Sequence, residues 1–239
     1  MTNSRPLPPT RRHGSLEISC ATFDDPVLYG RLLANAPSSG RCPVLLSDHA
    51  LPALGEDQNP IRVLAEVNRL DATAVLADRW PGTCPSCSSW LAPFGPSFPG
   101  LAPRFADVAD LQPDALVAAA VRMASEPRHM LLGIASADRP ADVPAAGGWT
   151  GMCNSWDDVA EVSAVLRSWE DRFGAVLVRM HLSTLELAVA APPWTVDDCE
   201  RVAAEHFAFT CDDDSPTPKT LRQYAQGLRG AQRWWFWWD

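Results

Sequence analysis

The chain of 239 residues lacks an excess of basic charge, and it also lacks any long apolar run. It carries 20 Lys and Arg residues against 29 Asp and Glu residues, which gives a net charge of −9. Nucleic-acid-binding surfaces need basic side chains to displace counterions from phosphates, so we expect no nucleic-acid partner. No run approaches the roughly 20 apolar residues that a membrane-spanning helix requires, so we also expect no membrane segment.

Familiar catalytic and metal-binding motifs are missing as well, including the nucleophile elbow, the phosphate-binding loop and the dinucleotide glycine pattern. The seven cysteines are scattered, and no hydrophobic signal region follows the basic start, which indicates reduced thiols and a cytoplasmic location. Cys84 and Cys87 form one CPSC pair, whereas a structural zinc site needs four ligands. We therefore expect no metal and no cofactor. A pair of loop thiols is the favoured interpretation, and metal or redox chemistry is the alternative.

Proline and glycine divide the chain into three parts. Residues 1–15 are basic and Pro-rich, which predicts a disordered arm. Residues 16–110 form an N-terminal portion with an expected strand over 43–47, helices from Asn59 and over 71–80, and a long Pro-rich loop over 81–103. Residues 111–239 form an α+β domain, which we expect to pack with the N-terminal portion as one unit.

The second half of the chain shows clear helical and strand periods. The first expected elements are a helix over 113–125, a strand over 129–135, and a strand from Gly148 that leads into a helix. Ser155 is expected to cap this helix, and Gly174 is expected to end it. A hairpin over 175–190, a helix with a capping box at Thr195 and Asp198, a helix from Thr217 and a final strand follow. This order predicts an α+β fold in which helices pack on a mixed, largely antiparallel sheet.

The final strand, RWWFWWD, is aromatic on both faces. Because successive strand residues point to opposite sides, Trp234, Phe236 and Trp238 share one face, and Trp235 and Trp237 share the other. Each large ring buries about 150–250 Å², so we expect this strand to lie inside the sheet as an anchor. It should be covered on both sides, or cover a core on one side and line a groove on the other.

Several separated stretches resemble one protein family. They are LAPFGPSFPGLAP, WTGMCNSWDDVAEVSAVLRSWEDRFGAVLV, TLELAVAAPPWT, RVAAEHFAF, TLRQYAQGL and FWWD. Together these motifs resemble a bacterial family known as domain of unknown function 4253, over about residues 90–239. The resemblance implies no activity. The family usually has Cys-Pro-Asp-Asn after the EHFAF stretch, whereas this chain has TCDDDSPTP, which implies that a family site in this loop would be altered or lost.

Three segments mix aromatic and polar side chains and predict where a ligand would bind. Asn154 falls in a turn before a helix, where backbone N–H groups can hold an anion, although turn formation alone explains an asparagine there. His206 lies on a helix, either as a general base or ligand or as a core-edge histidine that holds a hydrogen bond. The predicted ligand-binding residues are Trp149, Asn154, His206, Trp235, Trp237 and Asp239, and catalytic residues are not assigned.

Two further polar residues of the hairpin are interpreted as structural. His181 closes the first strand of the hairpin, and Glu186 alternates with Leu185 and Leu187, which predicts that its carboxylate faces solvent.

The sequence favours an acidic binding or interaction module, with an immunity-like or regulatory role suggested by analogy. The expected partner is a protein or a small hydrophobic or cationic ligand. The alternative is a small-molecule enzyme of specialised metabolism with a Trp-lined pocket, so the sequence leaves enzymatic activity open.

Overall fold

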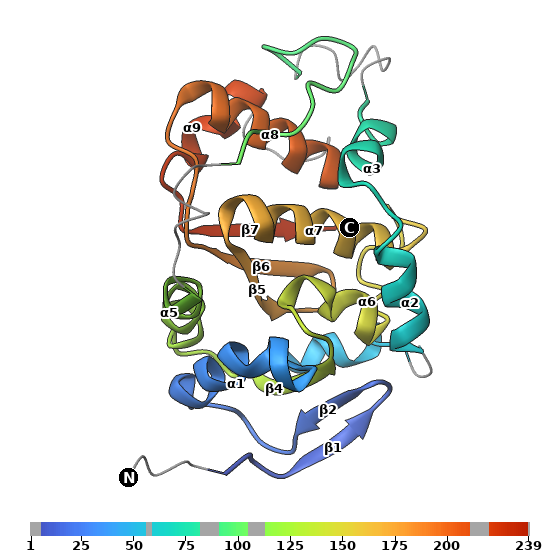
Figure 1. Cartoon of the computed structure of the whole chain (residues 1–239), viewed down its shortest axis with the longest axis vertical. Coiled ribbons are helices and arrows are strands. Elements are labelled where there is room, and N and C mark those ends of the chain that lie inside the picture. Colours follow the sequence, from blue (N-terminus) through green and yellow to red (C-terminus); the bar gives the residue numbers. More distant parts are fainter. Residues whose placement is uncertain (1–5, 56–58, 82–90, 105–112, 211–219, 239) are drawn as a thin grey trace.

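Seven strands form one sheet within the residues that the computed structural model describes, which are 6–55, 59–81, 91–104, 113–210 and 220–238 (Figure 1). The strands are β1 (Thr10–His13), β2 (Leu16–Ser19), β3 (Arg41–Leu46), β4 (Leu131–Ser136), β5 (Ala175–Met180), β6 (Thr184–Val189) and β7 (Arg233–Trp237). Their order is β1-β2-β4-β3-β5-β6-β7. β3 and β5 run parallel, and the other neighbours run antiparallel. The expected α+β fold with a mixed, largely antiparallel sheet is confirmed.

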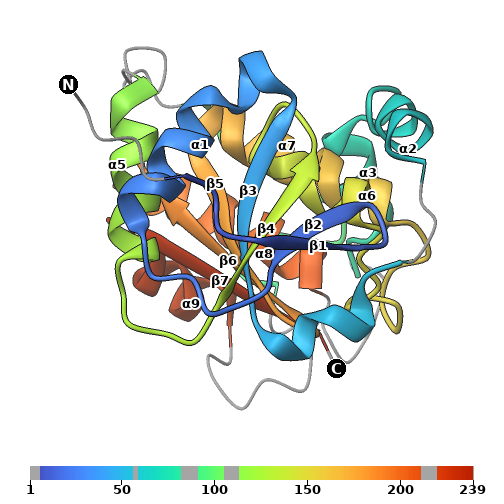
Figure 2. The ribbon, with the colours of Figure 1, turned by 90° about the horizontal axis from the view of Figure 1, so that it is seen from below.

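Helices cover both faces of this sheet. They are α1 (Pro26–Ser39), α2 (Pro60–Val67), α3 (Ala72–Asp78), α5 (Pro113–Ala124), α6 (Val143–Gly147), α7 (Val159–Phe173), α8 (Val196–Thr210) and α9 (Leu221–Leu228), with 3₁₀ helices η1 (Asp48–Ala53) and η2 (Pro140–Asp142). Figure 2 shows α1 and α5 on one side of the strands and α2 and α6 on the other. None of these described helices combines the length and the apolar character that a membrane span requires.

Each face of the sheet has its own apolar core. On the face that α1 and α5 cover, here called the α5 face, Tyr29 and Met123 pack against Val176 and Val178 of β5. The opposite α7 face has a larger core, in which α7 and α8 pack on β5, β6 and β7 and which contains Trp169, a side chain with no exposed surface. The sheet combines both portions of the chain, since β3 lies between β4 and β5.

Side chains predicted as caps determine several helix ends. At the start of α2, the Asn59 carboxamide oxygen accepts from the backbone N–H of Ile61 and of the next residue. Gly174 ends α7 in the left-handed conformation, with φ of 57°. The Asp198 backbone N–H donates to the Thr195 hydroxyl at 3.2 Å, as a capping box requires. These three predictions are confirmed.

Two expectations about the start of α7 are wrong. The predicted strand from Gly148 is absent from this described stretch, because α6 ends there and Trp149 forms only an isolated bridge with Leu54. Ser155 does not cap α7, because it lies four residues before Val159, where the helix begins. The Asp158 carboxylate caps α7 instead, and it accepts from the N–H two residues later at 2.8 Å.

The predicted disordered arm also differs from the structure. Residues 10–13 form β1, which pairs with β2 through a turn at Gly14, where φ is 57°. Leu16 and Ile18 of β2 have no exposed surface, so they fix β2 in the core and give β1 a strand to pair with. Residues 10–13 are ordered by backbone pairing, which composition alone does not reveal.

The C-terminal aromatic strand is part of the sheet, as predicted. Trp234, Phe236 and Trp238 are buried on the α7 face, whereas Trp235 is 55% exposed and Trp237 is 38% exposed on the α5 face. The correction concerns its neighbours. β7 pairs with β6 on one side and with no second strand of the described chain, so it is an edge strand with one buried aromatic face and one exposed aromatic face.

Candidate functional site

The structure places five of the six predicted ligand-binding residues, and their environments differ. Trp149 is buried, and its indole N–H donates to the His181 carbonyl at 3.0 Å. Asn154 is exposed in the turn before α7. Trp235 and Trp237 face away from the α7 side, where Trp149 and His206 lie. Asp239 lies outside the described residues. The five described side chains therefore do not converge on one site, and among them Trp235 and Trp237 are the two exposed aromatic side chains that lie on one face of one strand.

His206 is enclosed by aromatic rings. Its ring centroid lies 4.9 Å from that of Trp169, 4.5 Å from that of Trp234 and 4.8 Å from that of Phe236. Nδ1 lies 3.0 Å from the Tyr224 hydroxyl. Burial, together with the positive charge of Arg172, lowers the pKa of His206 to about 3. This histidine is a neutral core residue, which agrees with the structural alternative.

The buried His206 predicts a stability loss in acid. In the unfolded chain its pKa is near 6.5, so between pH 6.5 and 3 the unfolded chain binds the proton that the folded protein excludes. The stabilisation from neutral His206 is fully present above pH 6.5 and is lost as the pH falls toward 3. Urea unfolding measures this loss as the pH is lowered from 6.5 toward 3. For each pH unit, the free energy of unfolding of the wild type should fall by about 1.4 kcal/mol more than that of His206→Asn. Equal pH slopes for the two proteins would contradict this environment.

The opposite, α5 face carries an ionic cluster with a buried centre at strands β5 and β6, here called the Glu186 cluster. It consists of Glu126, Arg128, Arg179, His181, Glu186 and Arg233. Arg179 has no exposed surface, and Glu186 is almost completely buried. The prediction that Glu186 faces solvent is wrong, because α5 and the residues after it cover this end of the hairpin.

Four cationic or potentially cationic side chains converge on the Glu186 carboxylate. Oε1 accepts from Arg128 Nη1 at 3.2 Å and lies 3.1 Å from His181 Nε2. Oε2 accepts from Arg179 Nη1 at 3.2 Å and from Arg233 Nη2. Burial alone would raise the pKa of Glu186, but the His181 and Arg233 hydrogen bonds and the arginine charges lower it to about 2. Glu186 is therefore a fixed anion at neutral pH.

The two exposed tryptophans border this cluster. Glu186 lies directly opposite Trp235 in the β6–β7 register, and Thr184 lies opposite Trp237. Residues that face each other across neighbouring strands point to the same side of the sheet. The Trp235 ring therefore lies beside the charged cluster, on a part of the α5 face where the rings keep much of their surface exposed.

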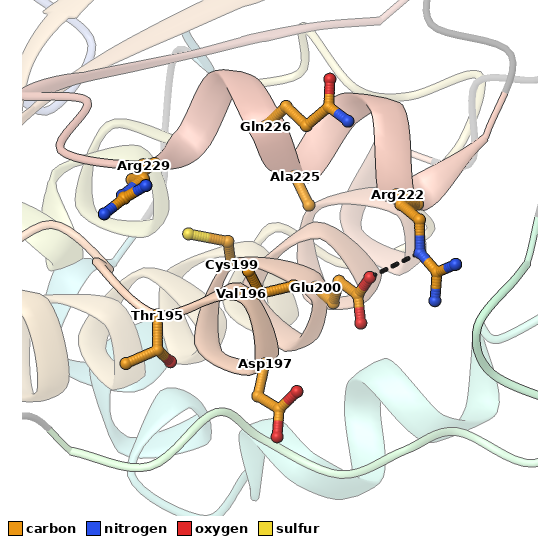
Figure 3. Close-up of a pocket in the computed structure, with 9 residues that line it drawn as sticks. All are labelled: Thr195, Val196, Asp197, Cys199, Glu200, Arg222, Ala225, Gln226 and Arg229. Atoms are coloured by element: carbon orange, nitrogen blue, oxygen red, sulfur yellow. Dashed lines mark hydrogen bonds and ion pairs between the residues drawn. The ribbon is translucent and has the colours of Figure 1, made fainter.

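A cavity of about 490 Å³ lies elsewhere, between α8 and α9 (Figure 3). It is lined by Thr195, Val196, Asp197, Cys199, Glu200, Arg222, Ala225, Gln226 and Arg229. Arg222 donates to Glu200 at 2.8 Å across it. Burial, and then the nearby Asp198, raise the pKa of the Cys199 thiol, so Cys199 does not provide a thiolate nucleophile. The cavity has the size of a ligand site, but two of its charged residues, Glu200 and Arg222, are already paired with each other.

The sequence contained one signal for the Glu186 cluster. Arg179 interrupts an otherwise apolar strand, and a buried arginine requires a carboxylate partner. Glu186 is seven residues later on the adjacent strand of the predicted hairpin. His181 was predicted to close the strand and directly follows it, since β5 ends at Met180. Its contact with Glu186 needs the register of the hairpin, which includes a bulge between Leu177 and Arg179.

The predicted cysteine pair and the acidic loop cannot be placed, because residues 82–90 and 211–219 lie outside the described part of the chain. Among the described residues, no cluster of three or more histidine, cysteine or acidic side chains has the arrangement of a metal site. The expectation of no bound metal stays a prediction.

Residues 131–239 match the protein family described as "Domain of unknown function (DUF4253)". The resemblance that the motifs indicate is confirmed over this range, which contains all of the quoted motifs except LAPFGPSFPGLAP. No curated protein and no solved structure matches the chain.

Proposed function

We propose that this protein is a cytoplasmic binding module that recognises a partner protein through the exposed face of β7. The main observation behind this proposal is the pair of exposed rings of Trp235 and Trp237. Large aromatic side chains that stay exposed next to each other are typical of interaction sites, because burying them in a partner releases much apolar surface from water. Tryptophan is also enriched among the residues that dominate binding energies at interfaces.

Two other features support a binding role. The rings lie on a strand whose opposite face is fixed in the core, so the surface is rigid and little side-chain freedom is lost on binding. Beside them, Arg128 and Arg233 of the Glu186 cluster are partly exposed and supply positive charges that would orient a partner. A rigid aromatic centre with charged groups around it is the usual composition of a protein interface.

A binding experiment with matched tryptophan variants tests this proposal. Wild-type protein, the double variant Trp235→Ser/Trp237→Ser and the control Trp194→Ser would each be used to capture partners from the native host, and each captured protein would be purified and titrated. Trp194 is 62% exposed but lies outside β7. Its variant therefore shows how much binding is lost when any exposed tryptophan is removed. We expect one stoichiometric partner that binds wild type and Trp194→Ser and loses at least tenfold in affinity for the double variant.

Equal affinity of that partner for all three proteins would contradict the proposal. If the variants have the same melting temperature as the wild type, a loss of affinity arises from the changed surface and not from unfolding.

The alternative function, a small-molecule enzyme, has one specific observation in its favour. His181 Nε2 lies 3.1 Å from the Glu186 carboxylate, and a carboxylate at this distance orients a histidine for proton transfer. His181→Gln separates the two functions. A binding module keeps its partner affinity in this variant, whereas an enzyme that uses His181 loses turnover of its substrate while its fold is retained.

A further inference from the structure

We infer that β7 binds its partner by strand addition, and that the added strand carries two apolar side chains followed by an acidic one in the pattern apolar-x-apolar-x-acidic. This inference rests on the proposed binding function and specifies its ligand as an extended, acidic protein segment. Its basis is the direction of the backbone groups of β7, the order of side chains along its exposed face, and the charge of the Glu186 cluster.

The backbone of β7 offers unpaired groups along its outer edge. The Trp238 N–H donates to the Ser183 carbonyl at 3.0 Å, and the Val189 N–H donates to the Gln232 carbonyl at 3.0 Å. In an antiparallel pair such bonds are made by alternate residues, so the even-numbered residues of this strand face β6. The N–H and C=O groups of Arg233, Trp235 and Trp237 therefore point away from β6, and they bond to no residue of the described chain.

A row of unpaired backbone groups is a template for another strand. Edge strands are usually protected by charges, proline or a bulge on the edge. β7 instead has two tryptophans and one arginine at its outward positions. The backbone would supply affinity and these three side chains would supply specificity, because alternate residues of an added strand lie beside them on the α5 face.

The register of an added antiparallel strand follows from this geometry. Its residues would meet Trp237, then Trp235, then Arg233, since the two chains run in opposite directions. Apolar side chains at the first two positions would cover the exposed indole rings. The third position would lie opposite Arg233, where a cross-strand pair of opposite charge is favourable.

The charge balance of the Glu186 cluster favours an acid at that third position. The cluster has three arginines (Arg128, Arg179 and Arg233) and two glutamates (Glu126 and Glu186), which leaves a surplus of one positive charge when His181 is neutral. Arg128 and Arg233 are both about 40% exposed at the side chain, so the surplus charge lies at the surface. A partner carboxylate would complete the pairing of this cluster.

The same balance disfavours a second copy of this chain as the occupant. Two antiparallel β7 strands would bring together two clusters that each carry surplus positive charge. The local charges are therefore not complementary in such a pair. An acidic extended segment of another protein fits both the rings and the arginines.

Synthetic peptides test the inference directly. The probe is the capped peptide Thr-Val-Thr-Val-Thr-Glu-Thr, whose two Val residues and Glu would face the α5 side, and its binding would be measured by tryptophan fluorescence and by calorimetry. The first comparison replaces Glu by Lys. The second places N-methyl groups on the two Val amides, which would point toward β7, and the matched control places them on the second and third Thr amides, which would point away.

We expect the Glu peptide to bind at least tenfold more tightly than the Lys peptide. Methylation of the Val amides should weaken binding at least tenfold, and methylation of the Thr amides should change it less than threefold. Arg233→Gln should remove the preference for Glu, whereas Arg222→Gln, which changes an exposed arginine of α9, should keep it.

Three results would overturn the inference. They are equal binding of the Glu and Lys peptides, insensitivity to Val N-methylation, and a Trp235-dependent dimer in sedimentation that excludes every peptide. The proposed function is tested separately, by a partner protein that binds the wild type and does not bind Trp235→Ser/Trp237→Ser. Such a partner could exist whatever the peptides do, so failure of this inference would leave the proposed function standing.

Discussion

Truncation of the chain after Arg233 is expected to leave no cooperatively folded protein. The deletion removes Trp234, Phe236 and Trp238, three side chains that are each about 2% exposed. Replacing one buried large aromatic residue by alanine costs roughly 3–5 kcal/mol, whereas a whole domain is stable by only about 5–15 kcal/mol. The combined loss is comparable with the total stability, and β6 also loses the strand that completes its hydrogen bonds.

The control for this truncation is a change on the other face of the same strand. Trp235→Ser/Trp237→Ser removes two rings that are largely or partly exposed, so its melting temperature should stay within a few degrees of the wild type. Thermal unfolding followed by circular dichroism measures both proteins. A truncated protein that is soluble and melts cooperatively would show that the aromatic strand is dispensable for the fold.

Replacing Glu205 by Ala is expected to lower the free energy of unfolding by about 3–5 kcal/mol. The Glu205 carboxylate has no exposed surface and accepts four hydrogen bonds. Oε1 accepts from the Ala102 N–H at 2.7 Å and from Arg172 at 2.9 Å. Oε2 accepts from Trp169 Nε1 at 2.7 Å and from Arg172 at 2.5 Å. The substitution leaves three buried donor groups without their acceptor, one of them charged.

The matched control lies on the same helix. Glu200→Ala also breaks a glutamate–arginine pair, but its partner Arg222 is 63% exposed and can turn to water. The expected loss is therefore below about 1 kcal/mol. Urea unfolding of both variants measures the difference. Similar losses for the two substitutions would contradict the assignment of Glu205 as the charged centre that ties α7, α8 and the segment near Ala102 together.

The sequence predicted the second half of the fold well because its local signals agree with the tertiary structure. Gly174 stops α7, the box at Thr195 and Asp198 starts α8, and the alternating hairpin forms β5 and β6. The first half was less predictable. Helix α1 contains Pro37 in its last turns, and β1 has no buried apolar residue, so neither element has a strong pattern of its own. Each depends on contacts with distant parts of the chain.

The exposed ring pair was predictable, whereas the cluster beside it was not. The period of two residues along the final strand separates Trp235 and Trp237 from the buried rings without any structure. Glu186 alternates with leucines in the way that a solvent-facing residue does, and the sequence alone does not show that α5 covers it. His206 was predicted as a possible ligand-binding residue, but aromatic residues of β7 and α7 bury it. These contacts come from distant parts of the chain, so the sequence of its own helix does not show them.

The strand β7 therefore combines two roles in five residues. Its even-numbered side chains close the core of the α7 face, and its odd-numbered side chains present rings and positive charge on the α5 face. Anchoring by the buried face explains how the exposed face keeps one fixed geometry. A recognition surface with this construction needs no mobile loop and little rearrangement on binding.

Amide hydrogen exchange along β7, followed by nuclear magnetic resonance, tests the central claim most directly. In the free protein the amides of Trp235 and Trp237 should exchange at least about a hundredfold faster than those of Trp234 and Phe236, which donate to β6. Adding the Glu-containing peptide should slow exchange at Trp235 and Trp237 and leave Trp234 and Phe236 unchanged. Equal, slow exchange of all four amides in the free protein would show that the outer edge is already covered, and it would contradict β7 as a binding surface.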